Sequence, residues 1–154
     1  MPLSQGDVMS EVRCVDGTNP AGISIRAIVI SHSCEIDKSS VKHAYVAAVL
    51  QIPLSQRPQI PKIKDGEFLN LFYLPETPAL GSESYVDLRT IFRVPFEELG
   101  CSFEKKDLGN RWLAHPDRRV AALSEVGISL LQFTCARYFG YGRDLALRDA
   151  IRVA

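Results

Sequence analysis

The chain has no excess of either charge and no long hydrophobic run. Its 18 Lys and Arg residues balance 18 Asp and Glu residues, which argues against a strongly basic nucleic-acid binder but leaves room for a local basic groove. The longest apolar runs, such as residues 45–50, are far too short to cross a bilayer. Residues 1–6 lack both the basic and the apolar segment of a secretory signal. We therefore expect a cytoplasmic protein with no membrane partner.

Closely spaced cysteines are also lacking. The gaps between successive cysteines are 20, 67 and 34 residues, so there is no CxxC pair among Cys14, Cys34, Cys101 and Cys135. In a reducing cytosol these thiols stay free. Cys14 and Cys34 could in principle share a metal ion with His32 and His43, but the spacing is not that of a structural zinc site. We expect neither a metal nor a cofactor.

Alternating or continuously apolar stretches predict a mainly β protein. The expected strands cover residues 6–13, 23–31, 44–50, 68–74, 85–94 and 118–123. Residues 53–61 hold three prolines and therefore form a long connection, and the polar residues 35–40 form a loop. Over residues 85–94, strict alternation predicts one face of Val86, Leu88, Thr90, Phe92 and Val94 and a second face of Asp87, Arg89, Ile91 and Arg93.

In the last thirty residues, the spacing of the apolar residues changes to that of a helix. Ser124 is a candidate N-cap, apolar residues then recur at helical spacing, and Gly140 is a natural end for the helix. A second short helix is expected over residues 143–151. The chain is therefore expected to be an α+β, mainly β protein, a small β-barrel followed by a C-terminal helix. A single domain would cover residues 1–154, with the barrel at about 5–123 and the helical segment at about 124–152.

Three places in this order resemble the MazF/PemK (Kid/CcdB-like) toxin family. They are the Gly6-Asp7-Val8 opening, the strand Arg26-Ala27-Ile28-Val29-Ile30-Ser31, and residues 85–99, followed by Leu123-Ser124 and a helix. The family has Arg-Pro where this chain has Arg26-Ala27, and its Gly-x-Glu-Gln segment is missing here. The resemblance implies an SH3-like barrel, a homodimer, a protein antitoxin as partner, and RNA cleavage without a metal.

The resemblance also assigns roles to particular residues. Arg26 matches the family's arginine and would stabilise the scissile phosphate, and Ser55 matches its hydroxyl, with Glu35 as a second candidate for proton transfer. From the residues themselves, Arg89 and Arg93 could line a groove with Arg26 and bind phosphate, because the planar guanidinium donates two hydrogen bonds at once. The alternative is a solvated strand face.

Residues 31–37 are the candidate functional centre. They present hydroxyl, imidazole, thiol and two carboxylates directly after a buried strand, including His32, Cys34 and Glu35. Cys34 could be a thiolate nucleophile beside His32 or His43, or a small buried side chain next to a solvated turn.

Three functions therefore stay open: a toxin-like or defence-associated bacterial protein that binds or cleaves RNA, a non-enzymatic barrel that binds protein or nucleic acid, and a cysteine-dependent enzyme. Arginines facing an open cleft favour the first, a groove filled by Phe or Leu favours the second, and a Cys34–imidazole pair favours the third.

Overall fold

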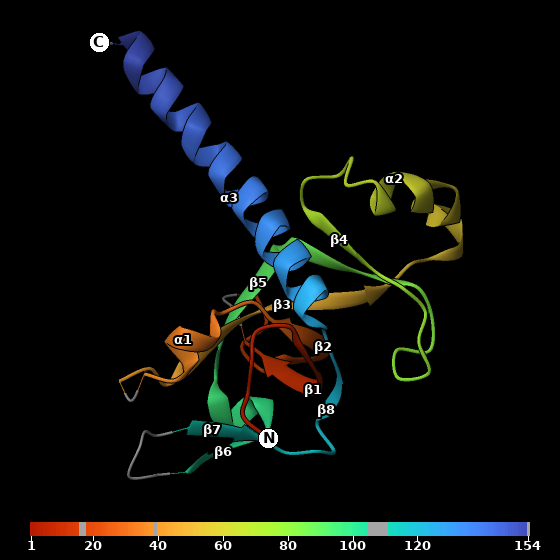
Figure 1. Ribbon diagram of the computed structural model, residues 1–154, viewed down its shortest axis with the longest axis vertical. Coiled ribbons are helices and arrows are strands. Elements are labelled where there is room, and N and C mark those ends of the chain that lie inside the picture. The colour runs from red at the N-terminus through yellow and green to blue at the C-terminus, as the bar shows by residue number, and fades with distance from the viewer. Residues whose placement is uncertain (16–17, 39, 105–110, 154) are drawn as a thin grey trace.

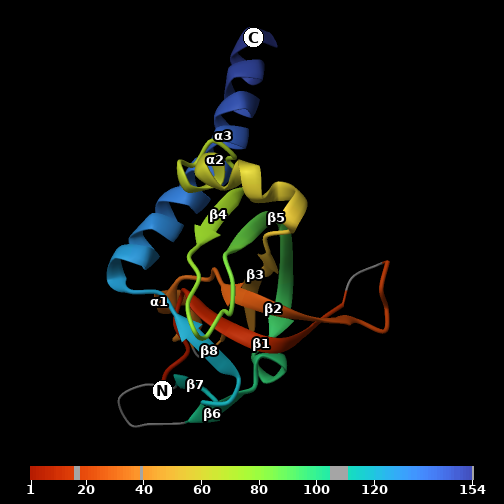
Figure 2. The ribbon, with the colours of Figure 1, turned by 90° about the vertical axis from the view of Figure 1, so that its right-hand side faces the viewer.

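The computed structural model describes residues 1–15, 18–38, 40–104 and 111–153, with side chains as far as residue 140. It is an α+β, mainly β fold with a C-terminal helix, which confirms the predicted class. A bent, barrel-like antiparallel sheet runs in the order β4-β5-β3-β2-β1-β8 (Figures 1 and 2). Its strands are β1 (Asp7–Cys14), β2 (Ile23–Val29), β3 (His43–Gln51), β4 (Leu71–Leu74), β5 (Ser84–Pro95) and β8 (Arg119–Ala122).

Two buried clusters pack on opposite faces of the sheet. Neighbouring residues of β1, Val8 and Met9, belong to different clusters, and so do Ile28 and Val29 of β2. This is the period of two that the pleat imposes on a strand buried on both faces. The two-sided burial explains why these strands are almost continuously apolar in the sequence.

A β-bulge in β5 overturns the predicted faces of residues 85–94. Ala47 lies opposite Ile91 while its neighbour Ala48 lies opposite Asp87, so residues 88–90 are extra on the β5 side. Val86, before the bulge, and Leu88, within it, pack in one core cluster, whereas Phe92 and Val94, after it, pack in the other. The single apolar face expected from strict alternation is therefore wrong, because the extra residues reverse the pleat. Arg89 and Arg93 consequently do not share a face.

Asp87 holds the bulge together from a buried position. It is 6% exposed and accepts hydrogen bonds from the Arg89 backbone N–H (3.0 Å), from the Arg89 guanidinium (3.1 and 3.2 Å) and from the Asn70 amide (3.2 Å). Burial raises the pKa of the Asp87 carboxyl, but these hydrogen bonds outweigh it and leave the pKa below its ordinary value of 3.8. The ionised form is therefore the one that the fold stabilises.

Replacing Asp87 with asparagine is expected to lower the free energy of unfolding by about 1–3 kcal/mol at pH 7, because the charge-assisted bonds are lost. The carboxyl's contribution is fully present above its unfolded pKa, near 3.8, and is lost as the pH falls through the lower folded value. Urea unfolding at pH 7 and again at about pH 3 should therefore show the difference between variant and parent shrinking in acid. An equal loss at both pH values would contradict this role of the charge.

The connections hold short helices in two places. α1 (Ser33–Ile36) replaces the start of the loop expected at residues 35–40, because the buried Ile36 anchors this turn in the core. The proline-rich stretch forms the 3-10 helix η1 (Leu54–Gln59) and then α2 (Ile60–Lys64), where Pro61 occupies the first turn, which tolerates its missing N–H.

After β5 comes the 3-10 turn η2 (Phe96–Leu99). A hairpin of β6 (Cys101–Glu104) and β7 (Arg111–Ala114) follows, and the sequence pattern did not predict it.

The C-terminal helix α3 (Glu125–Val153) is one continuous element. The Ser124 hydroxyl accepts a hydrogen bond from the Gly127 N–H (3.1 Å), which confirms the predicted N-cap. The expected end at Gly140 and the separate helix at 143–151 are wrong, since the helix continues through both. Leu131 anchors α3 in the core, and the helix then projects beyond the sheet (Figures 1 and 2). No helix among the described residues has the length and apolar character needed to span a bilayer.

Candidate functional site

An open cavity of about 820 Å³ lies on one face of β3 and β5. Its floor is formed by His43 and Tyr45 of β3 and by Ile91 and Arg93 of β5, and Tyr45 is the ladder partner of Arg93. Residues two apart on a strand point to the same face, so the β3–β5 register delivers all four side chains to one place. We call it the imidazole cavity, after the two histidines that line it.

The segment directly after β2 forms another wall of the cavity and is fixed to β3 by three hydrogen bonds. The Ile30 and Ser31 N–H groups donate to the Tyr45 carbonyl (2.9 and 3.3 Å), and the Ser31 hydroxyl accepts from the Tyr45 N–H (2.7 Å). His32 and Glu35, which follow Ser31 in the chain, line the same wall. Their backbone is thus positioned by the sheet rather than by a loose loop.

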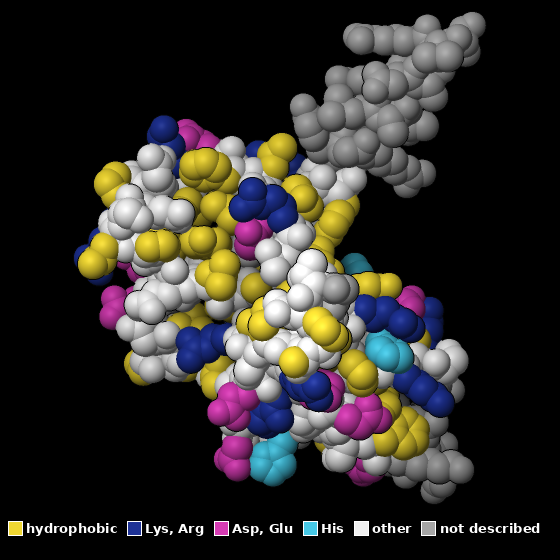
Figure 3. Space-filling model, turned by 180° about the vertical axis from the view of Figure 1, so that it is seen from behind, with side chains coloured by type: hydrophobic (Ala, Val, Ile, Leu, Met, Phe, Trp, Pro, Cys, Tyr) yellow, Lys and Arg dark blue, Asp and Glu magenta, His cyan; other side chains and the backbone are white. Residues whose placement is uncertain are grey.

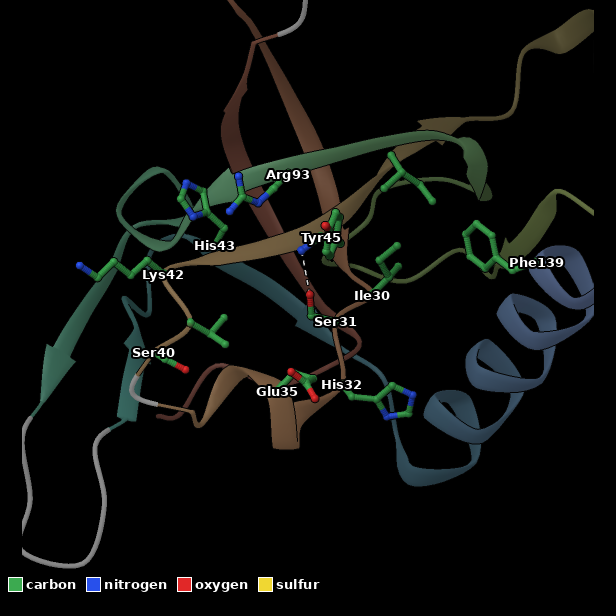
Figure 4. A pocket seen from close by; sticks show the side chains of 12 residues that line it. Ile30, Ser31, His32, Glu35, Ser40, Lys42, His43, Tyr45, Arg93 and Phe139 are labelled. Carbon is green, nitrogen blue, oxygen red and sulfur yellow. Dashed lines mark hydrogen bonds between the residues drawn. The ribbon is translucent and has the colours of Figure 1, made fainter. Parts of the chain in front are cut away.

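Figure 4 shows how the polar side chains divide around this space. His43 and Arg93 lie side by side at one end, His32 lies at the other end near α3, and Ser31 and Tyr45 lie between them. Imidazoles exchange protons near neutral pH, and a guanidinium binds phosphate or carboxylate oxygens in a planar, bidentate way. The arrangement therefore combines two proton-transfer groups with an anion-binding group in one open cavity.

A carboxylate, an ammonium and a hydroxyl complete the rim. Glu35 reaches the cavity from α1 and also forms an exposed ion pair with Lys38 at 2.6 Å. Ser40 and Lys42 come from the segment that leads into β3. In Figure 4 the Lys42 side chain extends away from the centre, so its charge acts at the rim.

The structure brings together only part of the residue set predicted from the sequence. His32, Glu35 and Arg93 line the imidazole cavity. Cys34 lies on α1 between two lining residues but is not among those that line it. Residues 31–37 thus contribute to the cavity mainly through their imidazole and carboxylate.

Arg26 and Ser55, the residues matched to the toxin family's arginine and hydroxyl, lie elsewhere. The Arg26 guanidinium donates to the Leu80 carbonyl (3.1 Å), and Ser55 is exposed in η1. Arg89 lines a separate cavity of about 540 Å³ beside η1 and β4. Arg93 lines the imidazole cavity, so the structure does not gather the three arginines of the expected groove in one cavity.

Sequence reasoning gave His43 a role only beside Cys34 or a metal, and it did not single out Tyr45. A usable signal existed, since His43 and Tyr45 alternate with the buried Ala44 and Val46 at the start of an otherwise apolar strand. A polar or aromatic residue repeated on one face of such a strand indicates an exposed functional face.

The four cysteines are free and differ strongly in environment. Burial raises the pKa of the Cys14 thiol to about 11 and that of Cys101 to about 12, and it also raises the pKa of the half-buried Cys135. Cys34 alone is exposed, and no hydrogen bond joins it to an imidazole within the described residues. The geometry therefore offers no paired base to Cys34.

Native protein treated with a thiol reagent is expected to react first at Cys34, because its sulfur is the exposed one, while Cys14 and Cys101 react only after unfolding. Mass spectrometry of the labelled peptides, with and without denaturant, measures this order. Cys34→Ser should abolish the fast phase. Rapid native labelling of Cys14 or Cys101 would contradict the burial described here.

No group of three or more His, Cys, Asp and Glu side chains is placed to hold a metal ion in the part of the chain that the structure describes. The chain matches no protein-family model, and no curated protein is significantly similar to it. The chemistry of the imidazole cavity is therefore inferred from its own residues.

Proposed function

We propose that the protein binds single-stranded RNA in the imidazole cavity and cleaves it without a metal. The observation that carries this proposal is that His32, His43 and Arg93 all line one open cavity. Cleavage through the ribose 2′-hydroxyl needs a base, an acid and stabilisation of negative charge, and these three side chains are the types that supply them.

The proposed reaction is a transfer of the phosphodiester to the neighbouring 2′-oxygen. One imidazole takes the proton of the 2′-hydroxyl, the 2′-oxygen forms a bond to phosphorus, and the bond from phosphorus to the 5′-oxygen breaks. The other histidine, as imidazolium, gives its proton to the departing 5′-oxygen. Arg93 donates hydrogen bonds to the non-bridging oxygens while their charge grows. The products are a 2′,3′-cyclic phosphate and a 5′-hydroxyl.

Two aromatic side chains at the cavity suit a single strand. Tyr45 is 52% and Phe139 50% exposed, and both line the cavity. Unpaired bases stack on exposed aromatic faces, whereas paired bases are already stacked on each other. On the face seen in Figure 3, charges of both signs are mixed with hydrophobic side chains. The neutral net charge then predicts binding that depends on this local groove rather than on a broad basic surface.

The toxin resemblance adds two proposals to this function. One is a cytoplasmic, toxin-like or defence-associated role with a protein antitoxin as partner. The other is a two-fold homodimer, the commonest form of soluble oligomer. Light scattering at high micromolar concentration tests the dimer, and a strict monomer would remove it.

The function is tested with a pool of single-stranded RNAs incubated with the protein in excess chelator. We expect cleavage that persists in the chelator and leaves 2′,3′-cyclic phosphate ends, identified by mass spectrometry. The matching DNA pool, which lacks the 2′-hydroxyl, should stay intact. RNA binding without any cleavage would overturn the nuclease proposal in favour of a binding module. Loss of cleavage after alkylation of Cys34 alone would instead favour the cysteine-dependent alternative.

A further inference from the structure

A second cavity, of about 490 Å³, continues from the imidazole cavity toward α3. The two share Ile30, His32 and Phe139, so His32 lies where they meet. In Figure 4 the Phe139 ring reaches from α3 toward Ile30. We call this second space the α3 cavity. A chain bound with a phosphate near His32 would have its next unit within reach of it.

Hydrogen bonds through Gln5 hold the side-chain amide of Gln132 in the wall of the α3 cavity. Gln5, which is 4% exposed, donates from its amide to the Ile30 carbonyl (2.9 Å) and accepts from the Gln132 amide (2.8 Å). The Gln5 N–H also donates to the Ser33 hydroxyl (3.1 Å). Within the described residues, no other hydrogen bond engages the carbonyl oxygen or the second amide N–H of Gln132.

Gly140 supplies an independent observation. It lies inside α3 and lines the α3 cavity, although glycine is less favourable than alanine in a helix. A Cβ built at this position meets no atom of the described residues within 4 Å, so close packing does not require glycine here. The space beside the Gly140 Cα, on the wall of the α3 cavity, is therefore open.

We propose that the α3 cavity binds the nucleobase next to the scissile phosphate, an inference that rests on the proposed RNA cleavage. Phe139 offers a face for stacking, and Gln132 offers a donor and an acceptor side by side, the pair that reads the edge of a base. No Lys or Arg from the described residues lines this cavity. It therefore suits an uncharged base rather than a phosphate.

The test compares kcat/KM for short RNAs that differ only in the base flanking the cleaved bond. The parent protein should prefer one base by about 5- to 100-fold, the range expected for one bidentate amide contact. Gln132→Ala should reduce this preference to nearly none. Gly140→Leu should lower kcat/KM about tenfold by filling the cavity, and its helix content should not fall, because leucine is the better helix former.

Two controls separate an effect on the α3 cavity from an effect on the fold or on the cleavage reaction. Phe133→Ala removes an exposed phenylalanine of α3 that does not line either cavity, so base preference should be unchanged. A substrate with an abasic flanking position should be cleaved equally by the parent and Gly140→Leu. If the parent cleaves RNA but Gln132→Ala and Gly140→Leu leave base preference and rate unchanged, the base subsite is overturned while the cleavage proposal stands. If the parent cleaves no RNA, both fall.

Discussion

Replacing His43 with alanine is expected to lower kcat/KM for RNA cleavage by about 10²- to 10⁴-fold, the usual contribution of one general acid or base. His43 is the first residue of β3, opposite Pro95 of β5, and its imidazole lines the cavity beside Arg93 (Figure 4). No core cluster includes it, so the melting temperature should change little. Steady-state cleavage of a fluorescent RNA, together with a thermal melt, measures both.

His115 provides the matched control. It is exposed between β7 and β8, close to Asp117 (3.6 Å), and it lines neither the imidazole cavity nor the α3 cavity. His115→Ala should therefore cleave like the parent, whereas His32→Ala should lose activity as His43→Ala does. Equal activity of all three variants would remove the imidazoles from the mechanism.

Leu131→Ala is expected to lower the free energy of unfolding by about 2–5 kcal/mol, the range for a buried leucine truncated to alanine. Leu131 is 0% exposed and packs in the cluster that holds Val8, Ile28 and Leu88. It is the only fully buried side chain among the α3 residues whose side chains are described. Urea unfolding followed by circular dichroism measures the loss.

The neighbouring leucine is a close control for this prediction. Leu130 is 55% exposed, so Leu130→Ala should change the free energy of unfolding by no more than about 0.5 kcal/mol. Since Gln132 and Phe139 are carried on the same helix, Leu131→Ala should also loosen the α3 cavity and weaken base preference. Similar stability losses in the two variants would mean that α3 does not dock through Leu131.

The regular part of the fold was predictable because alternation and burial leave a direct trace in the sequence. Val8, Ile28 and Val46 mark strands that are buried on both faces, and Ser124 marks the start of α3. The bulge in β5 leaves no such trace, since it depends on Asp87 gathering donors from its own strand and from Asn70. Likewise, the local pattern around Gly140 does not show that α3 continues through it.

The residues of the candidate site were likewise only partly predictable from the sequence. His32 and Glu35 could be found because they follow a buried strand in a dense polar segment. Arg26 and Ser55 were placed by resemblance along the chain, which carries no information about where the Leu80 carbonyl or η1 lies in space. His43 joins the site only through the register of β3 with β5, a pairing of residues about fifty apart that local patterns do not encode.

Binding of RNA in the imidazole cavity can be measured directly through the three histidines of the chain. Their imidazole proton signals can be followed by NMR while a 2′-O-methyl RNA, which cannot be cleaved through its 2′-oxygen, is added. We predict that the signals of His32 and His43 shift together with one binding curve, while that of His115 stays in place. A bound RNA that moves only His115, or none of the three, would contradict the account.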